Sequence, residues 1–427
     1  MRSKKPCYAA KSIFAIFMTL LLASTLVPAQ TQATKFTVLH TFHGAPNDGA
    51  APWGVLVRDG AGNFYGTTTS GGSGRGFCTN YGGCGTAFKF GKSGKKIWLH
   101  SFTFPKGWSP ETGLLRDAPG ALYGTTYGGG DTSCDSIGCG TVFALSPTGK
   151  ETVRYKFKGS PDGMFPTEQP LVEDTSGNLY GTTGNGGDYG VGAVFKIDKA
   201  GNETILYSFT GYSDGCYPDG VILDRSGNLY GVAFNCGNSG YGVAFKLDTS
   251  GSFTVLHAFG GGDGANPDSA LVFDSTGNLY GTTQNGGSGA CGGTGCGTVF
   301  ELSPQSGGGW SESVLYAFCS LSGCTDGEKP LFGPLAMDAS GNIYGTTYFG
   351  GAGGGCRPSG CGVVFKLDIS HHETVLHSFA GGKDGAYPGT GMILDNAGNL
   401  YGTAVNGGDL SCQPKYGGCG TLFKIAP

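Results

Sequence analysis

Five side chains whose types suit ligand binding follow loop prolines at intervals along the chain. They are Trp53, Glu111, Glu168, Asp219 and Asp268. Carboxylates accept hydrogen bonds from sugar hydroxyls and attract cations or basic groups, and an indole can stack on the apolar side of a sugar ring. Two carboxyls about 5 to 9 Å apart would also suit hydrolysis of a glycosidic bond. The five residues therefore form a candidate ligand-binding site, and the alternative is a row of solvated carboxylates at a polar rim.

Other aspartates recur too regularly to mark a site. One set stands in the pattern Asp-x-x-Gly-Asn or a variant of it, and a second set in the pattern Asp-Gly-x-x-Pro. An aspartate in a tight turn accepts backbone N–H groups of that turn, so turn formation alone explains one copy per repeat. The second set also lacks the alternating ligand pattern of a calcium loop. The first set is Asp59, Asp117, Asp174, Asp224, Asp274, Asp338 and Asp395, and the second is Asp48, Asp162, Asp214, Asp263, Asp326 and Asp384.

The histidines do not form a recognisable catalytic set. His40, His100, His257 and His377 share one position of a repeat, and the other copies have tyrosine there. This exchange indicates a packing or edge position, and no serine or cysteine is placed to act with a histidine as a nucleophile. We therefore assign no catalytic residue, no metal ligand and no cofactor.

Cysteine spacing predicts a disulfide framework. The fifteen cysteines comprise Cys7 near the N-terminus and fourteen in the rest of the chain. Zinc binding is the rival interpretation, but each cluster holds only two cysteines and has no histidine at ligand spacing. The close pairs are Cys78/Cys84, Cys134/Cys139, Cys291/Cys296, Cys319/Cys324, Cys356/Cys361 and Cys412/Cys419, and elimination pairs Cys216 with Cys236.

A motif of the form Gly-Asn-Leu-Tyr-Gly-Thr-Thr reveals the elements that must position these residues. In its third copy, Val, Ile, Tyr, Phe and Thr fill the segments 171–174, 178–183, 193–197 and 204–209, and turn residues fill the gaps. Four antiparallel strands per repeat, here named A to D, are the pattern of a propeller blade. The seven motif tyrosines are Tyr65, Tyr123, Tyr180, Tyr230, Tyr280, Tyr344 and Tyr401, at intervals of 50 to 64 residues.

The phase of the repeat predicts a closed ring. Residues 36–42 match strand D, and residues 421–425 match strand C. The first strand thus supplies what the last repeat lacks, so the two ends pair in one blade and leave no free end blade. We predict an all-β fold, a seven-bladed β-propeller of four-stranded antiparallel blades, with residues 34–427 as a single domain.

The repeated segments also point to a family. Leu-Tyr-Gly-Thr-Thr, Gly-Cys-Gly-Thr-Val-Phe-Lys-Leu, Val-Leu-Tyr-Ser-Phe and Asp-Gly-x-x-Pro together resemble the GloVer (Gloeo/Verruco) tandem repeat of exported bacterial proteins. The resemblance covers residues 36–427. It implies an exported repeat protein and brings no particular reaction with it.

Residues 1–33 are predicted to be a cleaved signal peptide. Basic residues at 2, 4, 5 and 11 precede an apolar run over 13–27, and cleavage after Ala29 or Ala33 would fit the small-residue rule. An uncleaved anchor is the alternative, although the run is short for a spanning helix. The 27 basic and 31 acidic residues give a net charge of −4, and loss of those four basic residues would make it −8. This balance argues against nucleic acid or an anionic membrane as a partner. The signal peptide and the cysteine pairs predict a location in the periplasm or outside the cell, where we expect a monomer.

The long connections, from strand B to C and from D to A, carry every cysteine outside the signal peptide. In propeller topology both sets lie on one face, where the acids, which sit on consecutive blades, should converge on one side of the mouth of the central channel. Three functions remain open. We favour an extracellular recognition module for a glycan or protein ligand; the alternatives are a carboxylate-dependent polysaccharide hydrolase or lyase and a structural surface or matrix protein.

Overall fold

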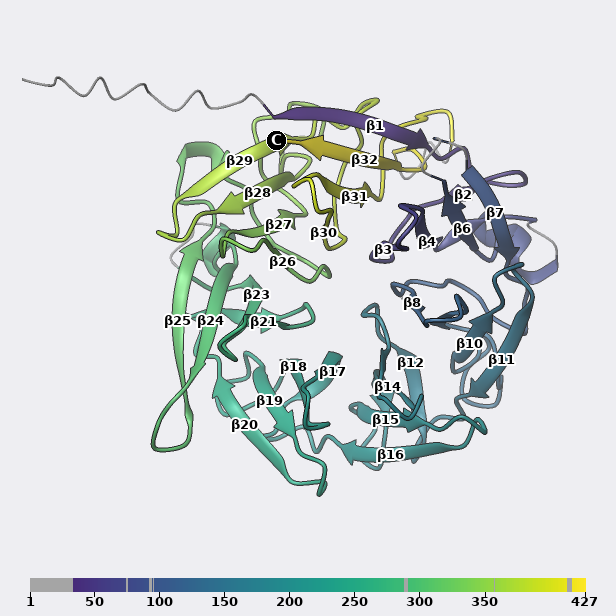
Figure 1. Ribbon diagram of the computed structural model, residues 1–427, viewed down its shortest axis with the longest axis horizontal. Helices are drawn as coiled ribbons and strands as arrows, with labels where there is room; N and C mark the ends of the chain where they lie inside the picture. The colour runs from purple at the N-terminus through teal and green to yellow at the C-terminus, as the bar shows by residue number, and fades with distance from the viewer. Residues whose placement is uncertain are drawn as a thin grey trace, which may run out of the picture. The chain divides into compact units, whose positions relative to one another are not determined.

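Residues with strand propensity and turn residues alternate along the chain, and they fold into seven antiparallel blades arranged in a ring (Figure 1). The computed structural model describes residues 34–427 except 74–75, 92–93, 95, 288–290, 357 and 413–416. The predicted signal peptide lies outside the described residues. Within them, no helix is both long and apolar enough to cross a membrane. The predicted fold class is confirmed.

Each blade is a sheet whose strands follow the chain from the centre of the ring outward. The first blade contains β3 (Val57–Arg58), β4 (Phe64–Thr68), β6 (Thr86–Phe90) and β7 (Lys96–Ser101). The second contains β8 (Leu115–Arg116), β9 (Leu122–Thr126), β10 (Thr141–Leu145) and β11 (Glu151–Lys156). The third contains β12 (Gly163–Pro166), β13 (Val172–Glu173), β14 (Leu179–Gly186), β15 (Ala193–Ile197) and β16 (Glu203–Ser208). The fourth contains β17 (Cys216–Leu223), β18 (Leu229–Asn235), β19 (Val243–Leu247) and β20 (Phe253–Ala258).

The remaining blades repeat this order. The fifth contains β21 (Ala265–Pro267), β22 (Val272–Phe273), β23 (Leu279–Asn285), β24 (Thr298–Pro304) and β25 (Trp310–Ala317). The sixth contains β26 (Ala336–Met337), β27 (Ile343–Thr347), β28 (Val363–Leu367) and β29 (Glu373–Ser378). The seventh contains β30 (Ile393–Leu394), β31 (Leu400–Ala404), β32 (Thr421–Ala426) and β1 (Lys35–Thr41). Loops hold the pair β2 (Gly49–Ala50) and β5 (Ser70–Gly71) and the 3-10 turns η1 (Gly76–Tyr81), η2 (Cys291–Gly293) and η3 (Ser322–Cys324).

The two ends of the repeat region close the ring, as predicted. β1 pairs antiparallel with β32, with Phe36 opposite Ile425, Val38 opposite Phe423 and Thr41 opposite Thr421 (Figure 1). The N-terminal strand thereby becomes the outer strand of a blade whose other strands come from the C-terminal end of the chain. β32 is therefore covered by a fourth strand, like strand C of every other blade.

A phenylalanine contact joins each blade to the next. The phenylalanine just after strand D of one blade meets the ring of the strand C phenylalanine in the following blade, at centroid distances of 4.9 to 5.3 Å. All of these side chains are 1% exposed or less. The pairs are Phe42/Phe88, Phe102/Phe143, Phe157/Phe195, Phe209/Phe245, Phe259/Phe300, Phe318/Phe365 and Phe379/Phe423.

All seven predicted disulfides are present. One joins Cys216 to Cys236 across 20 residues, with their Cα atoms 5.4 Å apart, so the pairing inferred by elimination is confirmed. The other six link cysteines five to seven residues apart within one loop. They are Cys78–Cys84, Cys134–Cys139, Cys291–Cys296, Cys319–Cys324, Cys356–Cys361 and Cys412–Cys419.

Some of these cysteines have a role that their spacing did not predict. Cys84, Cys139 and Cys419, which end their loops just before strand C, are 2%, 0% and 0% exposed and pack in the hydrophobic core. Their backbone carbonyls accept hydrogen bonds from the next blade, with Ser109 as the donor to Cys84 at 3.0 Å and Phe165 as the donor to Cys139 at 2.9 Å. Loop spacing could not reveal this, because the core contacts depend on how neighbouring blades pack. These cysteines are thus core residues that anchor the loops.

Ring closure gives the first testable prediction. Removing residues 34–43 deletes β1 and the Phe42 contact, so the outer edge of β32 becomes exposed and the truncated chain should aggregate and melt at a lower temperature. Size-exclusion chromatography with light scattering and a thermal melt would measure both effects against the chain that begins at Thr34. A synthetic peptide of residues 34–43 added in trans should restore part of the stability. A truncated chain that stays monomeric with unchanged melting would contradict ring closure by this strand.

Candidate functional site

The five predicted site residues lie where the chain enters the innermost strands. Trp53 precedes β3 and Glu111 precedes β8, while Glu168 lies between β12 and β13. Asp219 lies within β17, and Asp268 directly follows β21. Figure 1 shows these strands around the centre of the ring, with β7, β11, β16, β20, β25, β29 and β1 at its outside.

Threonine hydroxyls of the repeated motif hold these inner segments in place. Thr67 on β4 donates to the carbonyl of Thr112 at 2.8 Å, and Thr403 on β31 donates to the carbonyl of Pro52 at 3.1 Å. Each of these bonds runs from one blade to the inner segment of the next. The repeated part of the sequence thus positions the residues that differ from blade to blade.

A cavity of about 640 Å³ lies on the loop-rich face, and it contains three of the five predicted residues. Trp53, Glu111 and Glu168 line it, together with Trp108 and Ser109 of a D-to-A loop. Other lining residues come from B-to-C loops, which places the cavity on the face where the sequence predicted a site. They include Thr69, Ser70 and Gly82.

Asp219 and Asp268 do not line this cavity, because they are buried beside it. Their exposed fractions are 4% and 8%. The side-chain amide nitrogen of Gln169 donates to the carboxyl of Asp219 at 3.1 Å and to the backbone carbonyl of Phe332 at 2.7 Å. The backbone N–H of Phe332 in turn donates to the carbonyl of Asp268 at 2.9 Å. Phe332 is thus bonded both to Gln169, which holds Asp219, and to the backbone of Asp268. Because both carboxyls are buried, the interpretation as solvated rim carboxylates does not hold for these two.

Burial and mutual repulsion keep the proton on these carboxyls to an unusually high pH. Burial, with the charge of Glu168 added to it, raises the pKa of Glu111 to about 8, although Ser109 donates a hydrogen bond to its carboxyl at 2.9 Å. The same two causes raise the pKa of Asp219 to about 8. Burial also raises the pKa of Glu168 and, together with the charges of Asp219 and Glu168, that of Asp268. The four predicted acids form one electrostatic group.

Three buried polar atoms at this place have no hydrogen-bond partner among the described residues. They are Oδ1 of Asp219, Oε1 of Gln169 and Nε1 of Trp53. A buried polar atom without a partner costs free energy, so such atoms are uncommon in folded proteins. A hydrogen bond to a ligand or to water would satisfy each of these atoms.

Aromatic residues that the sequence analysis did not select complete the cavity wall. The ring of Trp108 lies 5.3 Å from that of Tyr81, and both line the cavity. Trp53 packs 5.1 Å from Phe332 and 6.2 Å from Tyr348. The sequence could have indicated Trp108, because it stands in the D-to-A loop that leads into the second blade, and this loop departs from the Asp-Gly-x-x-Pro pattern of the others.

The Asp-x-x-Gly-Asn aspartates hold turns, as expected. Asp59 accepts hydrogen bonds from the backbone of Asn63 at 2.8 Å and from the hydroxyl of Tyr65 at 2.9 Å. Although burial alone would raise it, these hydrogen bonds hold the pKa of Asp59 at about 2. Corresponding bonds link Asp174, Asp224, Asp274, Asp338 and Asp395 to the motif asparagine and tyrosine of their own blades.

The Asp-Gly-x-x-Pro aspartates have a second role that the sequence did not predict. Asp162 accepts a hydrogen bond from the hydroxyl of Tyr155 at 2.8 Å, and Asp263 lies 2.8 Å from Nε2 of His257. The strand D position that alternates between His and Tyr is therefore more than a packing position, because its polar end contacts the loop. Both side chains suit that position because each has a polar atom at a similar reach.

These observations define the class of protein as a seven-bladed β-propeller with an aromatic and carboxyl-lined cavity on its loop-rich face. The chain belongs to the Gloeobacter/Verrucomicrobia repeat family, which matches residues 23–166, 77–295 and 290–427. The resemblance inferred from the repeat is thereby confirmed. No curated protein sequence matches the chain.

Solved structures share the fold at low sequence identity. One is the extracellular domain of a protein described as the hybrid two component system BT3049 from B. thetaiotaomicron, with a TM-score of 0.54, 12% identity and coverage of 92% of this chain and 41% of that chain. Another is the extracellular domain of BT4673 from B. thetaiotaomicron, also described as a hybrid two component system, with a TM-score of 0.53, 15% identity and coverage of 92% and 42%. The chain thus spans about two fifths of the length of these domains.

The raised pKa of Asp219 gives a prediction for stability. The ordinary value for this group is 3.8 and the folded value about 8, so between these pH values the folded protein binds more protons than the unfolded chain. Its stability should therefore fall as the pH rises from about 4 to about 8. Asp219→Asn removes this dependence, so it should raise the melting temperature more at pH 8 than at pH 5.

Asp224→Asn, in the same blade, is the matched control for this experiment. The pKa of Asp224 is lowered by its turn hydrogen bonds despite burial, so its replacement should destabilise the protein by a similar amount at pH 5 and pH 8. Thermal melts of both variants at the two pH values would make the comparison. An equal shift for Asp219→Asn at both pH values would contradict the raised pKa.

Proposed function

We propose that the protein is an extracellular recognition module that binds a sugar unit of a glycan in the cavity lined by Trp53, Trp108, Glu111 and Glu168. The observation that carries the proposal is that indole rings and carboxyl groups line the same cavity. Indole faces stack on the apolar side of a sugar ring, and carboxyl groups bind its hydroxyls. The cavity volume of about 640 Å³ lies in the usual range for small-molecule sites.

The protonation state of the acids favours a sugar over a cation or a basic group. Since the pKa of Glu111 is about 8, its carboxyl is mostly neutral at pH 7. A neutral carboxyl has one O–H donor and acceptor oxygens, so it can both donate to and accept from hydroxyl groups. It attracts a positive charge much less than a carboxylate does.

The site predicts a specific effect of the two indoles. Screening the protein without residues 1–33 on a glycan array should identify a bound oligosaccharide, and calorimetric titration should then give its affinity. Trp53→Ala and Trp108→Ala should each weaken binding at least tenfold, because each removes a stacking surface of the cavity. Trp310→Ala is the matched control, since Trp310 lies on β25 and packs against Tyr230 away from the cavity.

Two results would contradict the glycan proposal. One is unchanged affinity in both cavity variants while the control also binds normally, which would move the site elsewhere. The other is the absence of any glycan binding by the intact protein, which would favour a protein ligand or a structural surface role. The buried acids have their own test in the pair Asp219→Asn and Asp268→Asn, which should alter binding only if these carboxyls support the cavity.

A polysaccharide hydrolase or lyase is the second candidate function. It is favoured by one observation: the charge of Glu168 helps to raise the pKa of Glu111 in the same cavity wall, so the two carboxyls are neighbours, and a pair of neighbouring carboxyls serves as acid and base in glycoside hydrolysis. Release of reducing ends from a polysaccharide panel, lost in both Glu111→Gln and Glu168→Gln, would establish it. Binding without release would support the recognition module.

Export is part of the proposal, and it predicts the N-terminus of the mature protein. The basic and apolar pattern of residues 1–33 and the seven disulfides both support secretion to an oxidising compartment. N-terminal sequencing of protein recovered from the periplasm or the medium should therefore begin at Gln30 or Thr34. Recovery of the chain with Met1 intact in the membrane fraction would instead indicate an uncleaved anchor.

A further inference from the structure

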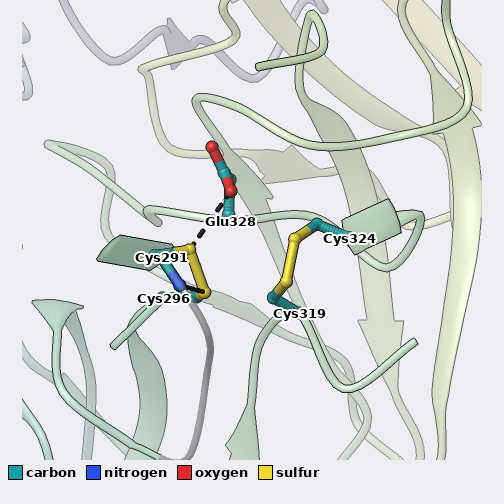
Figure 2. Close-up of side chains that lie close together, drawn as sticks. All are labelled: Cys291, Cys296, Cys319, Cys324 and Glu328. Atoms are coloured by element: carbon teal, nitrogen blue, oxygen red, sulfur yellow. Dashed lines mark hydrogen bonds between the residues drawn. A yellow bond between two sulfur atoms is a disulfide. The ribbon is translucent and has the colours of Figure 1, made fainter. Parts of the chain in front are cut away.

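Two of the disulfides meet at the boundary between the fifth and sixth blades. Cys291–Cys296 lies in the loop between β23 and β24, and Cys319–Cys324 lies in the loop that follows β25 (Figure 2). The four sulfur atoms and a carboxyl oxygen of Glu328 all lie within 4.8 Å of one another. Because the two pairs come from different loops, the sequence did not predict this cluster.

The two disulfides differ in how a thiol from solution can reach them. Cys296 is fully buried, and Sγ of Cys291 is covered by a Glu328 carboxyl oxygen 3.2 Å away (Figure 2). Cys319 and Cys324 are only half-buried, and the loop between them is exposed, with Leu321 52% exposed. Cys291 is half-buried as well, so Cys319–Cys324, here named the outer disulfide, presents two half-buried sulfur atoms, and Cys291–Cys296, the inner one, presents one that a carboxyl adjoins. Because thiol–disulfide exchange requires direct attack of a thiolate on a sulfur atom, the outer disulfide is the more accessible one.

We propose that Cys291–Cys296 and Cys319–Cys324 form one thiol–disulfide exchange site, in which a dithiol reduces the outer disulfide and the resulting thiols reduce the inner one. This proposal does not depend on ligand binding in the cavity lined by Trp53, Trp108, Glu111 and Glu168. The inner disulfide is reached from within the protein, by sulfur atoms that already lie close to contact with it. Its redox state is therefore set by that of its neighbour.

Each step of the exchange balances. A small dithiol transfers two electrons and two protons to Cys319–Cys324 and becomes a disulfide itself. One outer thiolate then attacks Sγ of Cys296, which breaks the bond to Cys291 and forms a mixed disulfide between the two loops. The Cys291 thiolate takes a proton from Glu328. The second outer thiol gives its proton to Glu328 and attacks its partner, which restores Cys319–Cys324 and releases Cys296 as a thiolate. Cys296 then takes up from solvent the proton that the first outer thiol released there when it became the attacking thiolate.

Glu328 is placed to serve as the proton donor in this sequence. Its carboxyl oxygen lies beside the leaving sulfur of Cys291, at the 3.2 Å already described. Burial raises the pKa of Glu328 above its ordinary value, although the charge of Lys329 opposes this shift. A raised pKa widens the pH range in which the carboxyl is protonated, and a protonated carboxyl can supply its proton to a departing thiolate.

The rate at which the inner disulfide opens tests the exchange. Folded protein would be treated with limiting dithiothreitol, quenched by alkylation at intervals and mapped by mass spectrometry. Replacing both outer cysteines, Cys319→Ser with Cys324→Ser, should slow the opening of Cys291–Cys296 at least tenfold. The matched control is Cys356→Ser with Cys361→Ser, which removes a disulfide of the same five-residue separation and should leave that rate unchanged.

A second measurement uses the unchanged protein and does not depend on the variants folding. Partial reduction should yield peptides in which Cys296 is bonded to Cys319 or Cys324, because the exchange passes through that mixed disulfide. Equal opening rates for Cys291–Cys296 in the double variant and the wild type would overturn the proposal. Absence of the mixed peptides from partially reduced wild-type protein would overturn it as well.

Discussion

The fold depends on one contact between phenylalanine rings that recurs at every blade boundary. An edge-to-face aromatic pair contributes stability beyond the apolar area that it buries, and here both rings are also removed from water. The motif glycine makes this packing feasible. A Cβ on Gly281 would lie 2.6 Å from the ring of Phe300, so any larger residue would displace the ring that the preceding blade packs against. The glycine of the repeated Leu-Tyr-Gly-Thr segment is thus required by close packing rather than by a turn.

Because this contact is the same in all blades, the rest of the blade can vary. The turn aspartates fix the A-to-B hairpins, and threonine hydroxyls such as those of Thr67 and Thr403 tie inner segments to a neighbouring blade. These polar contacts use residues of the repeat itself. Trp53, Glu111 and Glu168 differ from blade to blade at one position, and all three line the cavity.

The repeat made most of the architecture predictable from the sequence. Seven copies of one motif, with strand D at the start and strand C at the end, predicted the number of blades and the pairing of β1 with β32. Short cysteine spacings predicted the disulfides, because loop length restricts the partners that a cysteine can reach. The repeat also predicted that the site residues would lie close together, because they occupy the same position in different blades. Three of the five do line one cavity.

What the sequence did not predict arises where loops of different blades meet. Asp219 and Asp268 are buried where Phe332 bonds through its backbone to Gln169 and to the backbone of Asp268 across blades. The cluster of two disulfides arises in the same way, from a B-to-C loop and a D-to-A loop that meet at a blade boundary. The core position of Cys84 and Cys139 has this origin too, because the next blade covers them. Each loop leaves the repeat pattern, so its path is decided by tertiary packing rather than by local sequence.

The buried acids also bear on whether the ring is only a structural element. A purely structural ring gains nothing from Asp219, because burying a carboxyl with an unpaired oxygen costs free energy that an apolar residue would not. The seventh blade avoids this free-energy cost. It has Gly389 and Thr390 at the corresponding position, and Thr390 is hydrogen-bonded to Thr403. Acids persist only on the second to fifth blades, beside the cavity that carries two indoles. Their cost is understandable if the cavity binds a ligand whose hydroxyl groups approach these carboxyls, and this favours recognition over a purely structural role.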